Sequence, residues 1–211
     1  WMSLIASKSG ERGIFNRAAA KKQVEKLGDR RDSNHNFGTN PCSEIILRDK
    51  EFCNLTEVVV RPQDTPETLA EKVRLATILG TWQATLTDFR YLSKEWKTNC
   101  EEEALLGVSL TGIMDNAYTN GSYYHNERDK LPELLNELKN ITIDVNKKVA
   151  KQLGINPSAA ITCVKPSGTV SQLVDASSGI HARHSPYYIR TVRGDKKDPL
   201  CEFLVERGIP H

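Results

Sequence analysis

Two long stripes of apolar residues, spaced at three and four positions, constrain the fold more than any other feature of the sequence. The first follows Thr65 and Pro66, which suit the N-cap and the first position of a helix, and it predicts one helix that ends near Lys97. At about 1.5 Å per residue this helix would be roughly 45 Å long. The second stripe, at 131–153, predicts another helix that Gly154 ends. Helices of this length need a large body to pack against.

Short β-branched or apolar runs separate the helical stretches and predict strands. Residues 45–47, 56–60 and 187–192 are three of them. Residues 159–164 have no polar alternation, which is typical of a strand covered on both faces in an α/β sheet. Further helices are predicted at 18–27, 105–114 and 200–207. Together these elements indicate an α/β fold.

The bulk composition narrows the function classes. The 211 residues are enough for one large domain, and 29 Lys and Arg against 27 Asp and Glu leave a net charge of +2. This balance gives no basic field of the kind that binds nucleic-acid polymers, so an anionic ligand would have to be held locally. No apolar run approaches the roughly 18 residues of a membrane span, and the N-terminus has no targeting pattern. We therefore expect a cytoplasmic protein without membrane contact.

The five cysteines are an odd number, and the chain is long enough to be stable without disulfides, which argues against a disulfide framework. No C-x-x-C motif is present, so we expect no metal site. We assign Cys100 and Cys201 to structure, and His181 and His184 to the surface or to loops.

Cys42 lies on a loop opened by glycine and proline, between Asn40 and Glu44. Taken alone, a single cysteine is most often a buried structural residue. A neighbouring carboxylate raises the pKa of a thiol and opposes the thiolate that a nucleophile needs. The set instead fits a thiol used in its neutral form, as donor and acceptor of a hydrogen atom. Glu44 would then take a proton, and Asn40 would hold a hydroxyl.

Cys53 follows Cys42 by eleven residues, across a short strand and a turn. On its own it would be a core cysteine. From this position it could instead face the same pocket as Cys42 and supply reducing equivalents.

The turn at 166–170 is the best candidate for a phosphate site. It follows the strand at 159–164 and leads into a possible helix, whose N-terminus offers free backbone N–H groups and the positive end of a dipole. The alternative is an ordinary strand-to-helix loop, in which Lys165 adds charge or is simply solvated. The Gly-x-x-x-x-Gly-Lys-Ser/Thr pattern of nucleotide-hydrolysing P-loops is absent. The residues of the turn are Pro166, Ser167, Gly168, Thr169 and Val170.

Three ordered motifs together resemble the catalytic half of a ribonucleotide reductase large subunit. They are Asn40-Pro41-Cys42-Ser43-Glu44, Cys53 and Lys165-Pro166-Ser167-Gly168-Thr169-Val170. The adenosylcobalamin-dependent class II enzymes are the most similar, because they have similar Ser-Gly-Glu-Arg-Gly-Ile, Asn-Pro-Cys-x-Glu and Ser-Pro-Tyr-Tyr-Ile-Arg stretches. The resemblance covers most of residues 3–193.

This resemblance implies a ten-stranded α/β barrel with Cys42 at the tip of a central finger loop. Cys42 would become a thiyl radical and abstract the 3′ hydrogen of a ribonucleotide. Glu44 would deprotonate the 3′ hydroxyl, and Asn40 would hydrogen-bond the substrate hydroxyls. Cys53 would be one of two thiols that reduce the 2′ position as water leaves, and residues 166–170 would hold the substrate phosphates.

The resemblance also implies adenosylcobalamin as the cofactor and a thioredoxin-like reductant. Two alternatives stay open at this level. One is a class I subunit whose radical comes from a diiron partner, and the other is a catalytically inactive nucleotide-binding or assembly module. The substrate could be a ribonucleoside diphosphate or triphosphate.

The chain departs from the family pattern in what it lacks. The second reducing cysteine lies in the family's N-terminal half, and no cysteine precedes Asn40 here. The allosteric nucleotide region and the C-terminal cysteine pair are also missing. A ten-stranded barrel needs more chain than this, and half a barrel would leave open sheet edges. We therefore interpret residues 1–211 as the C-terminal part of a reductase barrel, a piece of a split enzyme or a fragment, that needs a complementary N-terminal chain.

Overall fold

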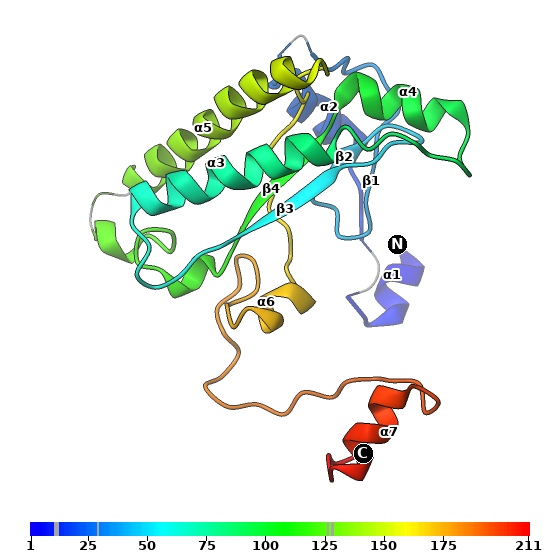
Figure 1. The fold of residues 1–211 in the computed structure, drawn as a ribbon, viewed down its shortest axis with the longest axis vertical. Helices are drawn as coiled ribbons and strands as arrows, with labels where there is room; N and C mark the ends of the chain where they lie inside the picture. The colour runs from blue at the N-terminus through cyan, green and yellow to red at the C-terminus, as the bar shows by residue number, and fades with distance from the viewer. Residues whose placement is uncertain (11–12, 29, 126, 128) are drawn as a thin grey trace.

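The computed structural model of the chain describes residues 1–10, 13–28, 30–125, 127 and 129–211 (Figure 1). Glu11 and Arg12 of the Ser-Gly-Glu-Arg-Gly-Ile stretch lie outside the described residues. The elements follow in the order α1 (Met2–Ser7), α2 (Arg17–Glu25), β1 (Gly38–Thr39), β2 (Ile46–Leu47), β3 (Asn54–Val59), α3 (Pro66–Gln83), α4 (Lys94–Glu103), β4 (Leu106–Thr111), η1 (Ile113–Asp115), η2 (Ser122–Tyr124), α5 (Lys130–Leu153), α6 (Thr169–Leu173) and α7 (Pro199–Glu206).

The body is a parallel strand pair with a third segment alongside it. β3 pairs with β4 along its full length. Residues 160–163 follow the other edge of β4, where Val108 and Thr162 form a parallel bridge. The N–H of Val108 donates to the carbonyl of Ile161 (2.8 Å), and the N–H of Cys163 donates to the carbonyl of Val108 (3.1 Å). Helices connect these parallel segments in sequence, so the fold is α/β.

Helices α3 and α5 pack side by side, and α3 lies across the strand pair (Figure 1). The core includes Val73 of α3, Leu106 of β4 and Leu138 of α5, which are all almost fully buried. Burial of each such side chain contributes about 1.5–3 kcal/mol. Thr65 and Thr68 form the capping box that begins α3, so the predicted start of this helix is confirmed.

The single helix predicted over 66–97 is wrong, because the chain divides it into α3 and α4. The hydroxyl of Thr85 donates to a carbonyl in the last turn of α3 (2.7 Å), which competes with continuation of the helix. Phe89 and Trp96, which extend the apolar stripe in the sequence, pack against Phe52 with ring centroids 5.2 and 4.6 Å away. A stripe that spans two elements therefore looked like one helix.

The helix predicted at 105–114 is also wrong, because residues 106–111 form β4. A short, continuously apolar run fits a buried parallel strand as well as a buried helix. Gly107 faces the side chain of Leu55 on β3, and a Cβ there would lie 2.4 Å from Leu55 Cδ2, so this side chain would have to shift. Gly112 has a φ of +80°, which glycine adopts readily, and the strand ends before it.

The strand predicted at 187–192 is wrong as well. This segment is exposed and has no ladder partner in the described part of the chain, and Ile189 is 97% exposed. β-branched residues stabilise a strand only when a neighbour offers a surface to pack on. The strand predicted at 159–164 is reduced to the single bridge at Thr162. The remaining predictions are confirmed, with ends shifted by one or two residues, as β2, β3, α2, α5 and α7.

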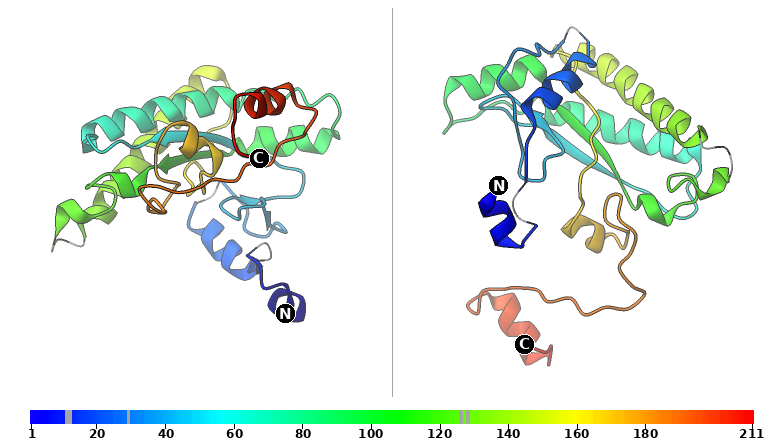
Figure 2. Two further views of the ribbon diagram at one scale, coloured as in Figure 1. Left: turned by 90° about the horizontal axis from the view of Figure 1, so that it is seen from below. Right: turned by 180° about the vertical axis from the view of Figure 1, so that it is seen from behind.

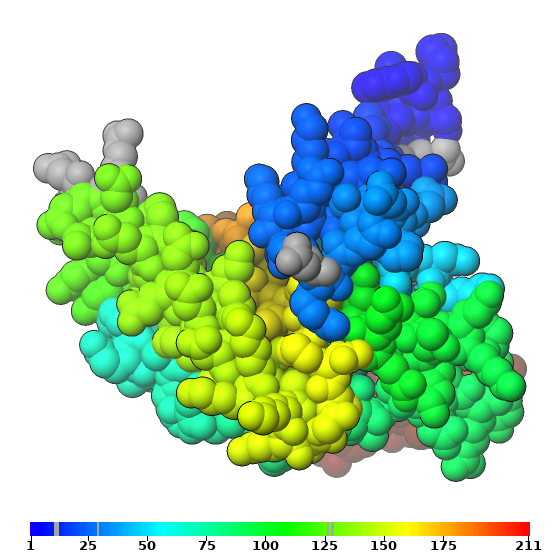
Figure 3. Space-filling model, turned by 90° about the horizontal axis from the view of Figure 1, so that it is seen from above, coloured from blue at the N-terminus to red at the C-terminus, as the bar shows by residue number. Residues whose placement is uncertain are grey.

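Both ends of the chain project from the body. Helix α7 follows an extended segment and lies apart from the other elements in the view from behind (Figure 2). Helix α1, dark blue, projects beyond α2 in the space-filling view (Figure 3). These terminal segments expose large apolar side chains, among them Trp1, Met2, Leu200 and Phe203. None of the helices described is both long and apolar enough to cross a membrane.

Replacing Asn146 of α5 with alanine should destabilise the fold. Its buried side chain donates to Thr81 Oγ1 of α3 (3.0 Å) and to Ser158 Oγ (2.9 Å), and it accepts from the N–H of Ser158 (2.8 Å). We expect urea denaturation to show a loss of about 2–3 kcal/mol, because buried groups lose their partners. Asn140→Ala, at an exposed position of the same helix, is the control and should change stability by less than about 0.5 kcal/mol. Equal stability of the two variants would contradict this role.

Candidate active site

Cys42 lies at the tip of a hairpin that β1 and β2 form by antiparallel pairing. The connecting loop at 40–45 is fixed by its own hydrogen bonds. The N–H of Ser43 donates to the Asn40 carbonyl (3.0 Å), and the N–H of Ile45 donates to the Asn40 side-chain oxygen (3.0 Å). Ser43 has a φ of +64°, which tightens the turn. Cys42 is exposed, so a ligand can reach its sulfur.

Glu44 and Lys165 form an ion pair beside Cys42. Lys165 Nζ donates to Glu44 Oε1 (2.9 Å) and to the sulfur of Cys42 (3.7 Å). The side chain of Glu44 is 3% exposed and that of Lys165 is 27% exposed. The second carboxylate oxygen, Oε2, is buried and has no hydrogen-bond partner among the described residues. Glu44 Oε2 therefore keeps an unused hydrogen-bond acceptor position, which neighbouring protein atoms cover.

The ion pair governs the protonation of both groups. Burial acts to raise the pKa of Glu44, but hydrogen bonds from Lys165, from its own backbone N–H and from Asn40 outweigh burial. The pKa of Glu44 therefore lies below its ordinary value. The hydrogen bond to Glu44 raises the pKa of Lys165. At neutral pH the site thus holds a carboxylate that is able to accept a proton.

Cys53 lies near a second thiol, that of Cys163. Gly107 of β4 makes room for both, because a Cβ at this position would lie 3.3 Å from Cys53 Sγ and 3.0 Å from Cys163 Sγ. Burial, followed by repulsion from the ionised form of Cys163, raises the pKa of Cys53. Burial, followed by the charge of Glu44, raises the pKa of Cys163 to about 11. Both groups are thiols rather than thiolates at neutral pH.

The turn at 166–170 follows directly on Lys165 and leads into α6. Ser167 is buried, and its Oγ accepts from the N–H of Ser171 (3.1 Å) while its carbonyl accepts from the Ser171 hydroxyl (2.7 Å). These bonds fix the turn. Helix α6 begins at Thr169, and the N–H groups in the first turn of a helix have no partner within the helix.

The structure brings the predicted site residues together only in part. Asn40, Cys42 and Glu44 share one loop, and Lys165 connects this loop to the start of the 166–170 turn. Within the described residues, no hydrogen bond joins Cys53 to Cys42 or to Glu44. The described part of the chain also has no group of three or more His, Cys, Asp or Glu side chains placed to hold a metal ion.

Two residues near the site were not identified from the sequence. Lys165 was expected to serve the phosphate turn or to be solvated, and it contacts Glu44 instead. Cys163 entered the sequence analysis only as part of a strand. The two-residue spacing of Cys163 and Lys165 could have indicated that both side chains face the site, because residues two positions apart in an extended run point to the same side. Glu44 acts on the titration of Cys163 as well as on that of Lys165, which places all three in one region.

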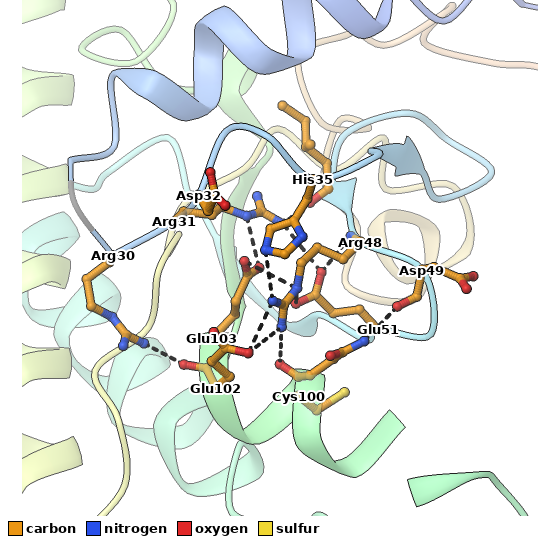
Figure 4. Close-up of polar contacts among 12 residues, drawn as sticks. Arg30, Arg31, Asp32, His35, Arg48, Asp49, Glu51, Cys100, Glu102 and Glu103 are labelled. Atoms are coloured by element: carbon orange, nitrogen blue, oxygen red, sulfur yellow. Dashed lines mark hydrogen bonds and ion pairs between the residues drawn. The ribbon is translucent and has the colours of Figure 1, made fainter. Parts of the chain in front are cut away.

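Four buried ionisable side chains hold the hairpin on the body (Figure 4). Arg31 precedes β1, Arg48 follows β2, and both face Glu51 and Glu103, the last residue of α4. Arg31 contacts Glu103 at 2.9 Å and Glu51 at 3.4 Å, and Arg48 contacts Glu103 at 3.4 Å and Glu51 at 3.6 Å. All four side chains are buried. Both ends of the hairpin are thereby fixed to α4.

The contribution of Glu51 to stability should be lost as the pH rises. Burial, followed by the neighbouring Glu103, raises its pKa from 4.5 to about 8. Between these values the folded chain binds more protons than the unfolded chain, so this contribution is complete below about pH 4.5 and is lost through about pH 8. We expect the stability of the wild type to fall relative to Glu51→Gln when urea denaturation is repeated from about pH 5 to pH 9. A difference that does not change with pH would contradict the raised pKa.

Comparisons with known proteins identify relatives of the chain. The chain is 32% identical to the adenosylcobalamin-dependent ribonucleoside-triphosphate reductase of Lactobacillus acidophilus, in an alignment of 81% of this chain with 25% of the relative. The protein of the same name from Lacticaseibacillus paracasei is 29% identical, over 98% of this chain and 30% of the relative. The chain belongs to the ribonucleotide reductase family. It spans less than a third of the length of these relatives.

A solved structure agrees with this relationship. The crystal structure of a B12-dependent class II ribonucleotide reductase matches 68% of this chain with a TM-score of 0.54 and 27% identity, and the match covers 22% of the solved chain. No family model matches the chain. The chain corresponds to a portion of a class II ribonucleotide reductase.

Proposed function

We propose that this chain contributes the catalytic cysteine of an enzyme that reduces ribonucleotides to deoxyribonucleotides by radical chemistry. One observation carries the proposal. The exposed sulfur of Cys42 lies beside Glu44, whose buried Oε2 has no partner in the part of the chain that the structure describes. When a sugar ring displaces the groups that cover Oε2, the sulfur and this oxygen would serve neighbouring atoms of the ring as hydrogen-atom acceptor and proton acceptor. The reductase relatives support the choice of a ribonucleotide.

In the first proposed step, a thiyl radical on Cys42 takes the 3′ hydrogen atom of the substrate. The sulfur becomes a thiol, and the unpaired electron moves to the 3′ carbon. Glu44 Oε2 accepts the proton of the 3′ hydroxyl. The side-chain oxygen of Asn40 already accepts from the N–H of Ile45, so its amide nitrogen is the group that would donate to a substrate hydroxyl.

In the later steps, Cys53 and a second thiol would supply two electrons. The 2′ hydroxyl leaves as water, the two thiols become a disulfide, and Cys42 returns a hydrogen atom to the 3′ carbon, which restores the thiyl radical. A thioredoxin-like reductant would then reduce the disulfide. Burial raises the pKa of Cys53, and this keeps it in the protonated form that the step uses.

The turn at 166–170 would hold the substrate phosphates. Lys165 is already paired with Glu44, so the free N–H groups at the start of α6 would be the principal donors. The names of the relatives favour a triphosphate as the substrate.

We infer that the strands belong to a ten-stranded α/β barrel that a complementary N-terminal portion completes. In the described residues β3 pairs on one edge only, and an open strand edge is a template for another strand. Helix α3 also exposes Leu75, Leu79 and Trp82, which offer an apolar surface for packing. The length of the relatives supports a larger assembly.

Adenosylcobalamin, which the names of the relatives specify, supplies the initiating radical when it is bound. Cys42 fits the role of the group that receives the radical, because it is exposed at a hairpin tip where a radical carrier can reach its sulfur. A diiron partner could reach the same sulfur and is the alternative radical source.

Replacing Cys42 with serine should abolish deoxyribonucleotide formation by the chain assembled with its N-terminal portion, adenosylcobalamin and a dithiol. Serine lacks the sulfur that exchanges the hydrogen atom, while the rest of the nucleotide site is unchanged. Product analysis should give background levels, and the Kd for the ribonucleotide should stay close to that of the wild type. Cys201→Ser, on α7, is the matched control and should retain activity. Product formation by Cys42→Ser would favour a module that only binds nucleotide or assists assembly.

The chain on its own should form no deoxyribonucleotide when it receives adenosylcobalamin, substrate and a dithiol. Half of the barrel and the second reducing thiol are missing from it in our proposal. Activity should appear when the chain is produced together with its N-terminal portion, and the two should co-elute in size-exclusion chromatography. Turnover by the isolated chain would show that no complementary portion is needed.

A further inference from the structure

We propose that Lys165 is a positioning residue for the radical step: it holds Glu44 ionised through Oε1 and so leaves Oε2 directed to the substrate hydroxyl. This inference rests on the proposed function, because the hydroxyl belongs to the proposed substrate. It concerns the residue just before the 166–170 turn, for which the sequence offered only phosphate binding or solvation.

Lys165 compensates the buried charge of Glu44. The side chain of Glu44 is 3% exposed, and a buried carboxylate is costly unless a cation and hydrogen bonds compensate its charge. Lys165 and Asn40 act on the titration of Glu44, Glu44 acts in turn on the thiols Cys53 and Cys163, and Cys42 lies beside the Lys165 ammonium. Lys165 is the cation among these groups. Without it, Glu44 would take up a proton at higher pH, so fewer molecules could accept the substrate proton under mildly acidic conditions.

The backbone of Lys165 belongs to a different part of the fold from that of Glu44. Lys165 is anchored on the sheet, because its N–H donates to Ser109 Oγ of β4 (2.8 Å), whereas Glu44 comes from the hairpin. The ammonium group therefore joins two parts of the fold. The same Nζ lies 2.9 Å from Glu44 Oε1 and 3.7 Å from Cys42 Sγ, so one group fixes the carboxylate relative to the sulfur.

Glu44 has one carboxylate oxygen that Lys165 leaves free. Lys165 occupies Oε1, and Oε2 is buried without a partner in the described chain. An unpaired buried acceptor is unfavourable, so a ligand that displaces the atoms covering Oε2 and donates to it gains binding energy. A substrate hydroxyl fits this requirement. Its proton moves to Oε2, and Lys165 keeps its own proton throughout, because a lysine ammonium group is protonated at neutral pH.

The pKa of Glu44 tests the proposal without any turnover. The ¹³C resonance of the Glu44 carboxyl, assigned with Glu44→Gln, is titrated in the wild type, Lys165→Met, Lys165→Gln and Lys165→Arg. We expect the midpoint to rise by about one pH unit or more in the two neutral variants and to return toward the wild-type value in Lys165→Arg. Lys147→Met, at an exposed position of α5, is the control and should leave the midpoint unchanged. An unchanged midpoint in folded Lys165→Met or Lys165→Gln would overturn the proposal.

The pH profile of the assembled reductase tests the same role during turnover. We expect the acidic limb of kcat/KM to move to higher pH in Lys165→Gln and to be restored in Lys165→Arg. A residue that only bound phosphate would raise KM at every pH without moving the limb, and that result would also overturn the proposal. An inactive wild-type assembly would refute the proposed function instead, while the carboxyl titration would still judge the link between Lys165 and Glu44.

Discussion

The position of the cysteine hairpin depends on four buried ionisable side chains. β1 and β2 share two residue pairs, too few to hold a hairpin in place without outside support. Arg31 and Arg48 flank the hairpin and meet Glu51 and Glu103. Desolvation offsets much of the attraction in such a cluster, so its net contribution to stability is small, but loss of one member leaves a charge uncompensated. The cluster therefore acts mainly on geometry.

The same cluster aligns the two halves of the candidate site. Glu103 ends α4, and the chain then enters β4, so the hairpin has a fixed relation to the sheet. The sheet carries Lys165 through residues 160–163 and through Ser109. Glu44 from the hairpin and Lys165 from the sheet form an ion pair, so their charges compensate each other beside Cys42. A near-neutral surrounding suits a thiol that exchanges a hydrogen atom, whereas an unpaired cation would favour a thiolate.

Local signals made part of the fold predictable. Thr65 and Pro66 define the start of α3, and Gly154, with a φ of +71°, ends α5 as expected. The apolar run at 105–114 fits a helix as well as a strand, and β4 forms by pairing with β3, which is distant in the sequence. The segment at 187–192 has strand-forming residues but no neighbouring strand in the described chain. Propensity could not reveal the missing partner.

The candidate site, like the fold, was predictable only in part from the sequence. Asn40, Cys42 and Glu44 were recognised because they lie within five positions of one another on one loop. Lys165 is separated from Glu44 by 121 positions, and no sequence pattern shows that they touch. The resemblance to the reductases supplied the roles of the loop residues, and the contact with Lys165 required coordinates.

A structure of the assembled reductase with a bound ribonucleotide would show whether Cys42 and Glu44 act on the same sugar. We expect the 3′ carbon to face the sulfur of Cys42, with the 3′ hydroxyl about 2.6–3.2 Å from Glu44 Oε2. A sugar bound away from this loop, or one that turns its 3′ position away from the sulfur, would exclude these roles for both residues.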